Sequence, residues 1–203
     1  MPRHAIVIID MLNDFAHPDG ALYCEGGRTI LPNLQKLMAW VRERKAKGLD
    51  DIQLIHIQEA HRPGDADFRV RPVHAIKGTW GSDFIPEVYP QEGEYIVQKR
   101  RHSAFQHTDL DLYLREENLD TVVITGAWTN VCCRCTANDA LANAYKVITL
   151  ADCNASKTQE MHEHGLVDLS IFTKVMNLDE YMAAWDRGED PWVGGGDPQN
   201  KVK

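Results

Sequence analysis

Three of the five cysteines in this 203-residue chain lie within four positions, at Cys132, Cys133 and Cys135, in the stretch TGAWTNVCCRCTANDA. Three kinds of chemistry could use such a cluster. One thiol could be a nucleophile with neighbours that only pack, Cys132 and Cys135 could form a C-x-x-C redox pair, or all three could bind a metal. The choice depends on the elements that position these thiols and on the reactive groups that those elements bring to them.

Short runs rich in β-branched residues alternate with longer amphipathic runs along the chain. The first kind predicts strands at 4–10, 51–57, 95–99, 121–125, 146–150 and 172–176. The second predicts helices at 28–48, 109–118, 131–144, 159–170 and 178–188. This alternation is typical of βαβ units, so we predict an α/β fold: a Rossmann-like, three-layer α-β-α sandwich with a mainly parallel sheet of about six strands. We expect one domain at residues 1–186 and a flexible or partner-docking C-terminal tail at 187–203.

Reactive side chains follow three of the predicted strands. Asp10 ends the first strand, Lys99 ends the third, and Cys132 lies in the turn after the fourth. Each residue alone has an ordinary structural explanation, as a turn residue, a solvated lysine or a packing thiol. Because the carboxyl ends of parallel strands meet at one edge of a sheet, the three together predict a nucleophile site.

The physical chemistry of a thiol favours Cys132 as that nucleophile. A free thiol has a pKa of about 8.5, so little of it is ionised at neutral pH. A helix N-terminus and the charge of Lys99 would both favour the thiolate. The carboxylate of Asp10 could take the thiol proton and later deliver it to a leaving amine.

Three sequence blocks, AIVIIDMLNDF, KRRHSAF and TGAWTNVC followed by TANDA, resemble the motifs of the isochorismatase-like cysteine hydrolases, in the same order. That superfamily includes carbamoylsarcosine amidases, ureidoacrylate and biuret amidohydrolases, and nicotinamidases, and the resemblance covers residues 5–182. It implies a cysteine hydrolase that cleaves a C–N bond of a small amide or ureide through a thioester, with Asp10, Lys99 and Cys132 as its catalytic triad. It also implies a cis peptide bond at Ala127–Trp128 and an oxyanion hole formed by the N–H groups of Trp128 and Cys132.

The other two clustered cysteines have simpler explanations within this interpretation. Helical spacing from Cys132 predicts a small apolar stripe that packs on the sheet, made of Cys133, Ala137, Ala140, Leu141 and Ala144. Cys135 lies one turn beyond Cys132 and is expected to pack. A redox pair would leave Asp10 and Lys99 without a role, and metal binding is disfavoured because a helix points Cys133 away from the other two thiols.

Residues 58–94 form a long excursion between two strands, and such excursions are usually functional. The resemblance implies that nicotinamidase-like members hold a metal here with one Asp and two His, and Glu59, His61 and His74 could match those positions. However, the chain has Glu where the pattern has Asp, and GTWGSDFIPEV resembles a metal-free amidase branch. We therefore expect no cofactor, with His61 and His74 making loop hydrogen bonds and a divalent metal as the alternative.

The substrate pocket is predicted from positions in the excursion and the motif loops. A small planar carboxamide or ureide suits a pocket of aromatic and amide groups, here Phe15, Gln58, His61, Trp80, His102, Phe105 and Trp128. Ordinary loop packing is the alternative for each of them. His102 could carry a second proton or serve as a hydrogen-bonding wall.

Composition limits the partners. The net charge of −8 argues against nucleic acid and against an anionic membrane surface. The sequence has no apolar run near the roughly 20 residues of a membrane span, and its clustered, odd-numbered cysteines suit a cytoplasmic setting. The resemblance implies a homodimer or homotetramer. The alternatives are an isochorismatase that cleaves a vinyl ether, a thiol redox protein, and a binding module for which Cys132 is dispensable.

Overall fold

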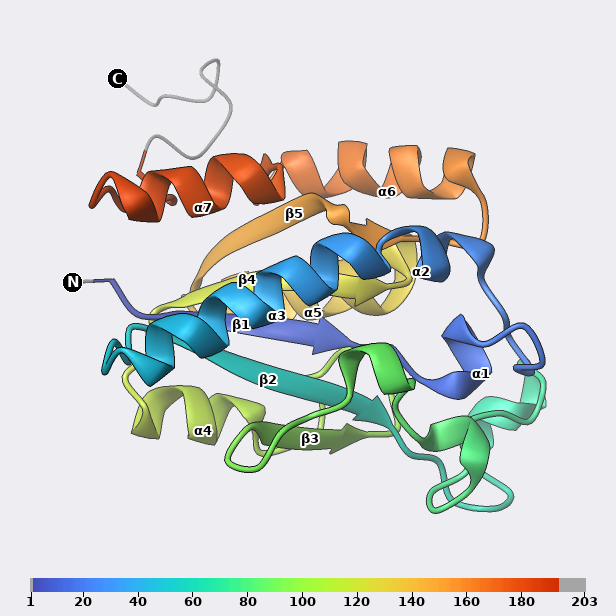
Figure 1. The fold of residues 1–203 in the computed structure, drawn as a ribbon. Coiled ribbons are helices and arrows are strands. Elements are labelled where there is room, and N and C mark those ends of the chain that lie inside the picture. The colour runs from blue at the N-terminus through green and yellow to red at the C-terminus, as the bar shows by residue number, and fades with distance from the viewer. Residues whose placement is uncertain (1, 194–203) are drawn as a thin grey trace.

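A six-stranded sheet forms the centre of the computed structural model, which describes residues 2–193 (Figure 1). The strands are β1 (His4–Ile9), β2 (Ile52–Glu59), β3 (Tyr95–Lys99), β4 (Thr121–Ala127), β5 (Lys146–Ala155) and β6 (Lys174–Met176). They lie in the order β3-β2-β1-β4-β5-β6, with every neighbouring pair parallel. The predicted α/β sandwich is confirmed, although β2, β4 and β5 extend beyond their expected ends and β6 begins two residues later than expected.

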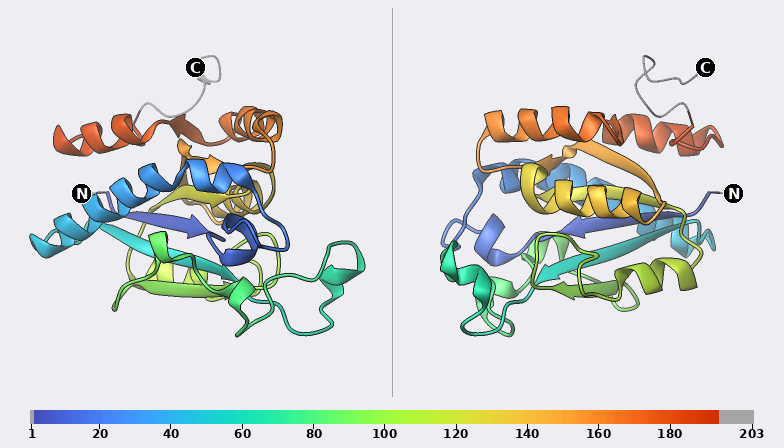
Figure 2. Two further views of the ribbon diagram at one scale, coloured as in Figure 1. Left: turned by 45° about the vertical axis from the view of Figure 1, so that its right-hand side comes forward. Right: turned by 180° about the vertical axis from the view of Figure 1, so that it is seen from behind.

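Alternate residues of β1 face opposite sides of the sheet, so the core has two halves. Ile6 and Ile8 pack with apolar residues of α3 (Leu31–Ala46) and α7 (Leu178–Asp186). Val7 and Ile9 pack on the other face with α4 (Leu110–Glu116), α5 (Arg134–Ala142) and α6 (Gln159–Ser170). The view from behind shows α4 and α5, in yellow-green and yellow, in front of the sheet (Figure 2). Strands covered on both faces bury their side chains completely, as β1 does.

The helix predicted at 28–48 is instead two helices, α2 (Glu25–Thr29) and α3. Pro32 lies in the first turn of α3, where its missing N–H has no intrahelical partner to lose. Inside one continuous helix its ring would clash with the carbonyl group of Arg28. The chain therefore breaks at Ile30.

The helix predicted at 131–144 begins earlier and ends sooner. A π-helical turn (Thr129–Cys133) precedes α5, and α5 ends at Ala142. Ala144 adopts a left-handed conformation with φ of 68°, so that the N–H of Tyr145 bonds to the carbonyl of Ala140 and the helix closes. The predicted packing of Cys133, Ala137 and Ala140 is confirmed.

For the rest of that stripe, the prediction was wrong. Leu141 is 47% exposed and Ala144 lies outside the helix. The helix ends at Ala142, before Ala144, and Tyr145, which directly precedes β5, packs into this half of the core instead.

The excursion between β2 and β3 contains three 3-10 turns, at Ala66–Arg69, Trp80–Ser82 and Pro86–Val88. It folds back toward α1 (Asn13–Ala16), which follows β1: isolated bridges pair Leu12 with Phe84 and His61 with Ile76. The excursion therefore covers the carboxyl ends of β1 and β2.

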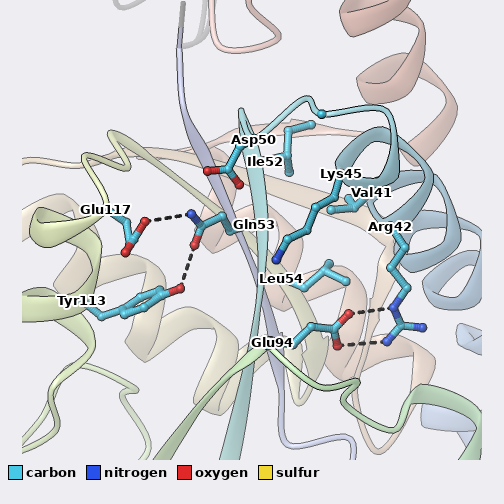
Figure 3. A pocket seen from close by; sticks show the side chains of 12 residues that line it. Val41, Arg42, Lys45, Asp50, Ile52, Gln53, Leu54, Glu94, Tyr113 and Glu117 are labelled. Atoms are coloured by element: carbon cyan, nitrogen blue, oxygen red, sulfur yellow. Dashed lines mark hydrogen bonds and ion pairs between the residues drawn. The ribbon is translucent and has the colours of Figure 1, made fainter.

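A cavity of about 390 Å³ lies at the opposite end of the sheet, beside the first residues of β2 (Figure 3). Arg42 and Lys45 of α3 line one side, and Tyr113 and Glu117 line the other. Because ligands of such sheets bind at the carboxyl ends of the strands, this cavity lies away from the expected chemistry.

The last described residues pack against their own chain. The Lys174 ammonium group donates to the carbonyl oxygens of Pro191 and Val193, and Trp192 packs on the core. Residues 194–203 of the predicted tail lie outside the described residues. Within residues 2–193, no helix has the length and apolar character to cross a membrane.

Candidate active site

The structure brings the three predicted strand-end residues together. Lys99 Nζ lies 2.7 Å from Asp10 Oδ2 and 3.7 Å from Cys132 Sγ. Asp10 follows β1 and Cys132 follows β4, and these neighbouring strands flank the point where the strand order of the sheet reverses. Sites of doubly wound sheets form at that point, which explains why these ends hold the reactive groups.

The backbone fixes Asp10 in an unusual conformation. Its φ is 51°, in the left-handed region that Asp tolerates better than most residues. Its N–H donates to the carbonyl oxygen of Ile57, and its Oδ1 accepts the N–H of Glu59 at 3.0 Å. Both contacts come from β2, so the neighbouring strand aims the Asp10 carboxylate.

Cys132 lies in the π-helical turn, which follows a cis peptide bond at Ala127–Trp128. The resemblance implied a cis bond at this position. The N–H groups of Val131 and Cys133 both donate to the carbonyl oxygen of Trp128, which holds the turn closed around the thiol. π-helical turns often occur at functional sites.

Ser156, which follows β5, and residues of α6 hold the same turn from outside. Ser156 Oγ donates to Asn130 Oδ1 at 2.8 Å, and His162 Nδ1 lies 2.8 Å from Thr129 Oγ1. Gly165 of α6 lies so close that an added Cβ would be 3.0 Å from the Asn130 nitrogen. These contacts hold in place the turn that carries Cys132.

Burial determines the charges of the triad. Asp10 and Lys99 are each 1% exposed. Burial, together with the charge of Glu59, raises the pKa of Asp10 to about 6 despite the nearby ammonium group. Burial alone would lower the pKa of Lys99, but the charges of Asp10 and Glu59 raise it, so Lys99 stays protonated.

Burial of Cys132 outweighs the charge of Lys99, which by itself favours the thiolate. Burial raises the pKa of Cys132 well above its ordinary value, and the charge of Lys99 only partly offsets this effect. The resting group is therefore a neutral thiol. It must lose its proton to a neighbour as it attacks, and Asp10 is the carboxylate placed for that transfer.

Glu59 is a fourth buried ionisable residue, and the sequence suggested it only as a metal ligand. It ends β2 opposite Lys99, and its Oε2 lies 4.0 Å from Lys99 Nζ. Ligand atoms of Asp10, Glu59 and Cys132 all lie within 4.8 Å of one another. The position of Glu59 at a strand end beside β1 is the signal that could have placed it in the site.

His61 and His74 lie beside Glu59. His61 Nε2 is 2.9 Å from Glu59 Oε1, and His74 donates from Nδ1 to the carbonyl oxygen of Pro72 at 2.7 Å. Both therefore make the loop hydrogen bonds expected of them. The sequence missed Arg71, whose Nη1 lies 3.2 Å from Glu59 Oε1.

Three of the predicted pocket residues lie near the triad. His102 Nδ1 is 3.9 Å from Cys132 Sγ. Burial lowers the pKa of His102, as do the charges of Arg71 and Lys99, so its ring is neutral. Phe15 contacts Trp128 edge-on, with ring centroids 6.4 Å apart.

The other predicted pocket residues contact different groups. Gln58 donates to the Ser82 carbonyl oxygen and accepts from Gln98, and Trp80 stacks edge-on against His17. Phe105 packs toward Tyr145, and with His102 it lines a cavity of about 640 Å³ that also reaches Cys135. The structure thus places His102 beside the Cys132 sulfur, and Phe15 against Trp128 at the start of the turn that carries Cys132. Their binding of substrate stays a prediction.

Comparison with known protein families places the chain in one of them. A family model described as the isochorismatase domain matches residues 4–180. The chain belongs to the isochorismatase family. The resemblance predicted from the three sequence blocks is confirmed, and the chain is a hydrolase of this family.

Individual relatives extend the comparison. A probable inactive nicotinamidase of Arabidopsis thaliana is 31% identical over 185 residues, which cover 87% of this chain and 93% of that protein. An N-carbamoylsarcosine amidase of an Arthrobacter species is 28% identical over 206 residues, covering 93% of this chain and 74% of that protein. A solved structure of an isochorismatase-like hydrolase from Alkaliphilus metalliredigens is 72% identical, with a TM-score of 0.88, covering 90% of this chain and 99% of that one.

Proposed function

We propose that this member of the isochorismatase family hydrolyses a C–N bond of a small amide or ureide through a thioester on Cys132. The proposal depends chiefly on one observation: the buried Lys99 ammonium group lies between the carboxylate of Asp10 and the sulfur of Cys132. A carboxylate, a fixed cation and a thiol within reach of one another are the parts that nucleophilic acyl transfer needs. Relatives with amidase names support the same reaction class.

In the first half of the reaction, Asp10 accepts the thiol proton as Cys132 Sγ attacks the carbonyl carbon. A pKa of about 6 suits this role, because Asp10 is mostly ionised at neutral pH yet basic enough to take a proton. Lys99 stabilises the negative charge on sulfur. The C–N bond then breaks, the proton on Asp10 passes to the leaving nitrogen, and ammonia or an amine departs.

The second half restores the thiol. Asp10, again ionised, takes a proton from a water molecule that attacks the thioester, and the acid product leaves as sulfur regains a proton. In both halves the negative oxygen of the tetrahedral intermediate would be stabilised by the N–H groups of Trp128 and Cys132. These steps need no cofactor, because Asp10 carries each proton and the charges on sulfur and oxygen are stabilised by Lys99 and the backbone N–H groups.

The substrate class follows from the groups nearest the sulfur. Phe15 and Trp128 offer aromatic surfaces that suit a planar group. The indole Nε1 of Trp128 is buried without a hydrogen-bond partner among the described residues, so it is available to a substrate oxygen. His102 is neutral and close to sulfur, so one of its ring nitrogens can bond to the amide.

An ammonia-release screen over small carboxamides and ureides tests the proposal. We expect at least one to be hydrolysed, with kcat/KM falling by roughly 10⁴-fold or more in Cys132→Ser, as in enzymes that lose a nucleophile. Cys135→Ser is the matched control, because it removes a thiol three positions away, and it should retain activity. Mass spectrometry of the reaction quenched in acid should find the acyl group on Cys132.

The same variants separate the other functions. A C-x-x-C redox protein would lose its activity in both cysteine variants. An isochorismatase would release a product from a vinyl ether and none from amides. Activity that survives Cys132→Ser would overturn the proposed mechanism.

A further inference from the structure

Four side chains near the triad form a compact set of oxygen and nitrogen atoms. One ligand atom each from Glu59, His61, Asp67 and His74 lies within 4.8 Å of all the others. Glu59, His61 and His74 are buried, and the Asp67 side chain is 14% exposed. Asp67, in the excursion, was not among the ligands predicted from the sequence.

In type and geometry these donors could hold a divalent metal. Two imidazoles and two carboxylates are common ligands of zinc and similar ions. His74 Nδ1 donates to a backbone carbonyl, which leaves Nε2 as an acceptor. This Nε2 atom is buried without a hydrogen-bond partner among the described residues, and it lies 3.6 Å from Glu59 Oε1.

A cation of the protein itself contacts this set. Arg71 Nη1 lies 3.2 Å from Glu59 Oε1 and 3.0 Å from Asp67 Oδ2, and the Arg71 side chain is only 18% exposed. Glu59 Oε1 also lies 2.9 Å from His61 Nε2. The carboxylate oxygens that would bind a metal therefore already bind a guanidinium, whose charge would repel a divalent ion.

We propose that Arg71 is a built-in cation that takes the place of a metal in the cluster of Glu59, His61, Asp67 and His74. As they stand, these four residues do not fit a resident metal ion, because Arg71 already contacts the two carboxylates, Glu59 and Asp67, that the ion would need. Removing this one side chain should convert the cluster into a metal site.

Arg71 also helps to keep Glu59 ionised beside the triad. Burial would raise the pKa of Glu59, but the charge of Lys99, the hydrogen bond from His61 and the charge of Arg71 lower it well below its ordinary value. Glu59 therefore remains an anion beside Lys99 without an external ion. The metal binding that tests this proposal needs no substrate, so its outcome is independent of the proposed amidase reaction.

Titration with Co²⁺ is a direct test, because Co²⁺ in a four-coordinate site of nitrogen and oxygen ligands absorbs visible light. Binding to a cysteine thiolate would add a separate band, so the spectrum distinguishes the cluster from the thiols. The protein is titrated as wild type, as Arg71→Met and as Arg69→Met. Arg69 is exposed two positions away, so its variant loses the same charge outside the cluster. We expect Arg71→Met to bind one equivalent of Co²⁺, on the order of 10- to 100-fold more tightly than the other two, the range over which groups beside metal ligands alter affinity.

Further variants and a structural check complete the test. The double variant Arg71→Met/His74→Ala should lose the new site, and Arg71→Gln should reproduce it if Arg71→Met does not fold, as judged by circular dichroism. One result would overturn the proposal: wild type binds one equivalent of Co²⁺ as tightly as Arg71→Met does, and the His74→Ala substitution abolishes the absorption of that bound Co²⁺. It is equally overturned if neither folded Arg71 variant binds more tightly than wild type.

Discussion

The ammonium group of Lys99 lies 2.7 Å from the carboxylate of Asp10, and each residue is only 1% exposed. Such a pair adds little net stability, because removing two charges from water offsets most of their attraction. The pair matters here because it positions two charged groups beside the nucleophile. The pair holds a permanent cation beside Cys132 and a carboxylate that takes protons near neutral pH.

Replacing Lys99 by Met should therefore abolish activity and also destabilise the fold. The variant leaves the Asp10 carboxylate buried without a counter-ion, which costs about 3–5 kcal/mol in the free energy of unfolding. The double variant Asp10→Asn/Lys99→Met removes both charges and should recover most of that stability while remaining inactive. Urea unfolding and kcat/KM measure the two effects.

A double variant as unstable as Lys99→Met would contradict this account, because it would mean that the two charges do not interact. Retained activity in either variant would contradict the catalytic assignment.

The pH dependence of activity should report the proton acceptor. Asp10 has to be ionised to take the thiol proton, and burial raises its pKa to about 6. We therefore expect kcat/KM to fall about tenfold per pH unit below about pH 6 and to level off above it. His102→Asn should keep this acidic limb, because burial lowers the pKa of His102. If the limb disappears in His102→Asn, the proton acceptor is His102 instead of Asp10.

Gly165→Ala should reduce activity without unfolding the protein. An added Cβ would lie 3.0–3.1 Å from backbone and side-chain atoms of Asn130, so the turn that carries Cys132 must shift by a few tenths of an ångström. Alanine also favours the interior of α6 by about 1 kcal/mol over glycine, which offsets the strain. We expect kcat/KM to fall about tenfold, since small misplacements of reacting groups are costly.

The exposed neighbour His164→Ala is the control for the Gly165 variant and should behave as wild type. Equal activity of Gly165→Ala and wild type would show that α6 does not set the position of the nucleophile.

The sequence was sufficient for features that depend on local pattern and on general rules of parallel sheets. Alternating strand and helix patterns predicted the sandwich, and the strand-end rule placed Asp10, Lys99 and Cys132 at one edge. The helical spacing placed Cys133 in the core. Each of these predictions used residues near one another in the chain, together with a rule about where strands end.

Other features depend on contacts between distant segments and had no sequence signal of this kind. Arg71 reaches Glu59 from the excursion, which has no periodic pattern to predict where its side chains point. The neutral state of the Cys132 thiol results from its burial, which outweighs the nearby charge of Lys99. Burial is a property of the packed fold, so the residues next to Cys132 in the sequence do not show how strongly it opposes ionisation.

Glu94, which directly precedes β3, allows a test of stability that is separate from the active site. It forms a two-point ion pair with Arg42 (Figure 3). It also accepts a hydrogen bond from His56 of β2. Burial would raise the pKa of Glu94, but hydrogen bonds from His56, Arg42 and the Gln91 N–H lower it to about 2. Because its folded pKa is below its unfolded value of about 4.3, its stabilisation is complete above that pH and is lost as the pH falls toward 2.

Glu94→Gln should therefore lower the free energy of unfolding by up to about 3 kcal/mol at neutral pH, the equivalent of a pKa shift of about two units. The difference from wild type should shrink as the pH falls below about 4 and become small near pH 2, because Glu94 is then protonated in the unfolded chain and increasingly protonated in the folded protein. Urea unfolding at a series of pH values measures it, with the exposed neighbour Glu92→Gln as control. A difference that stays constant across this range would show that Glu94 stabilises the fold by packing instead of by its charge.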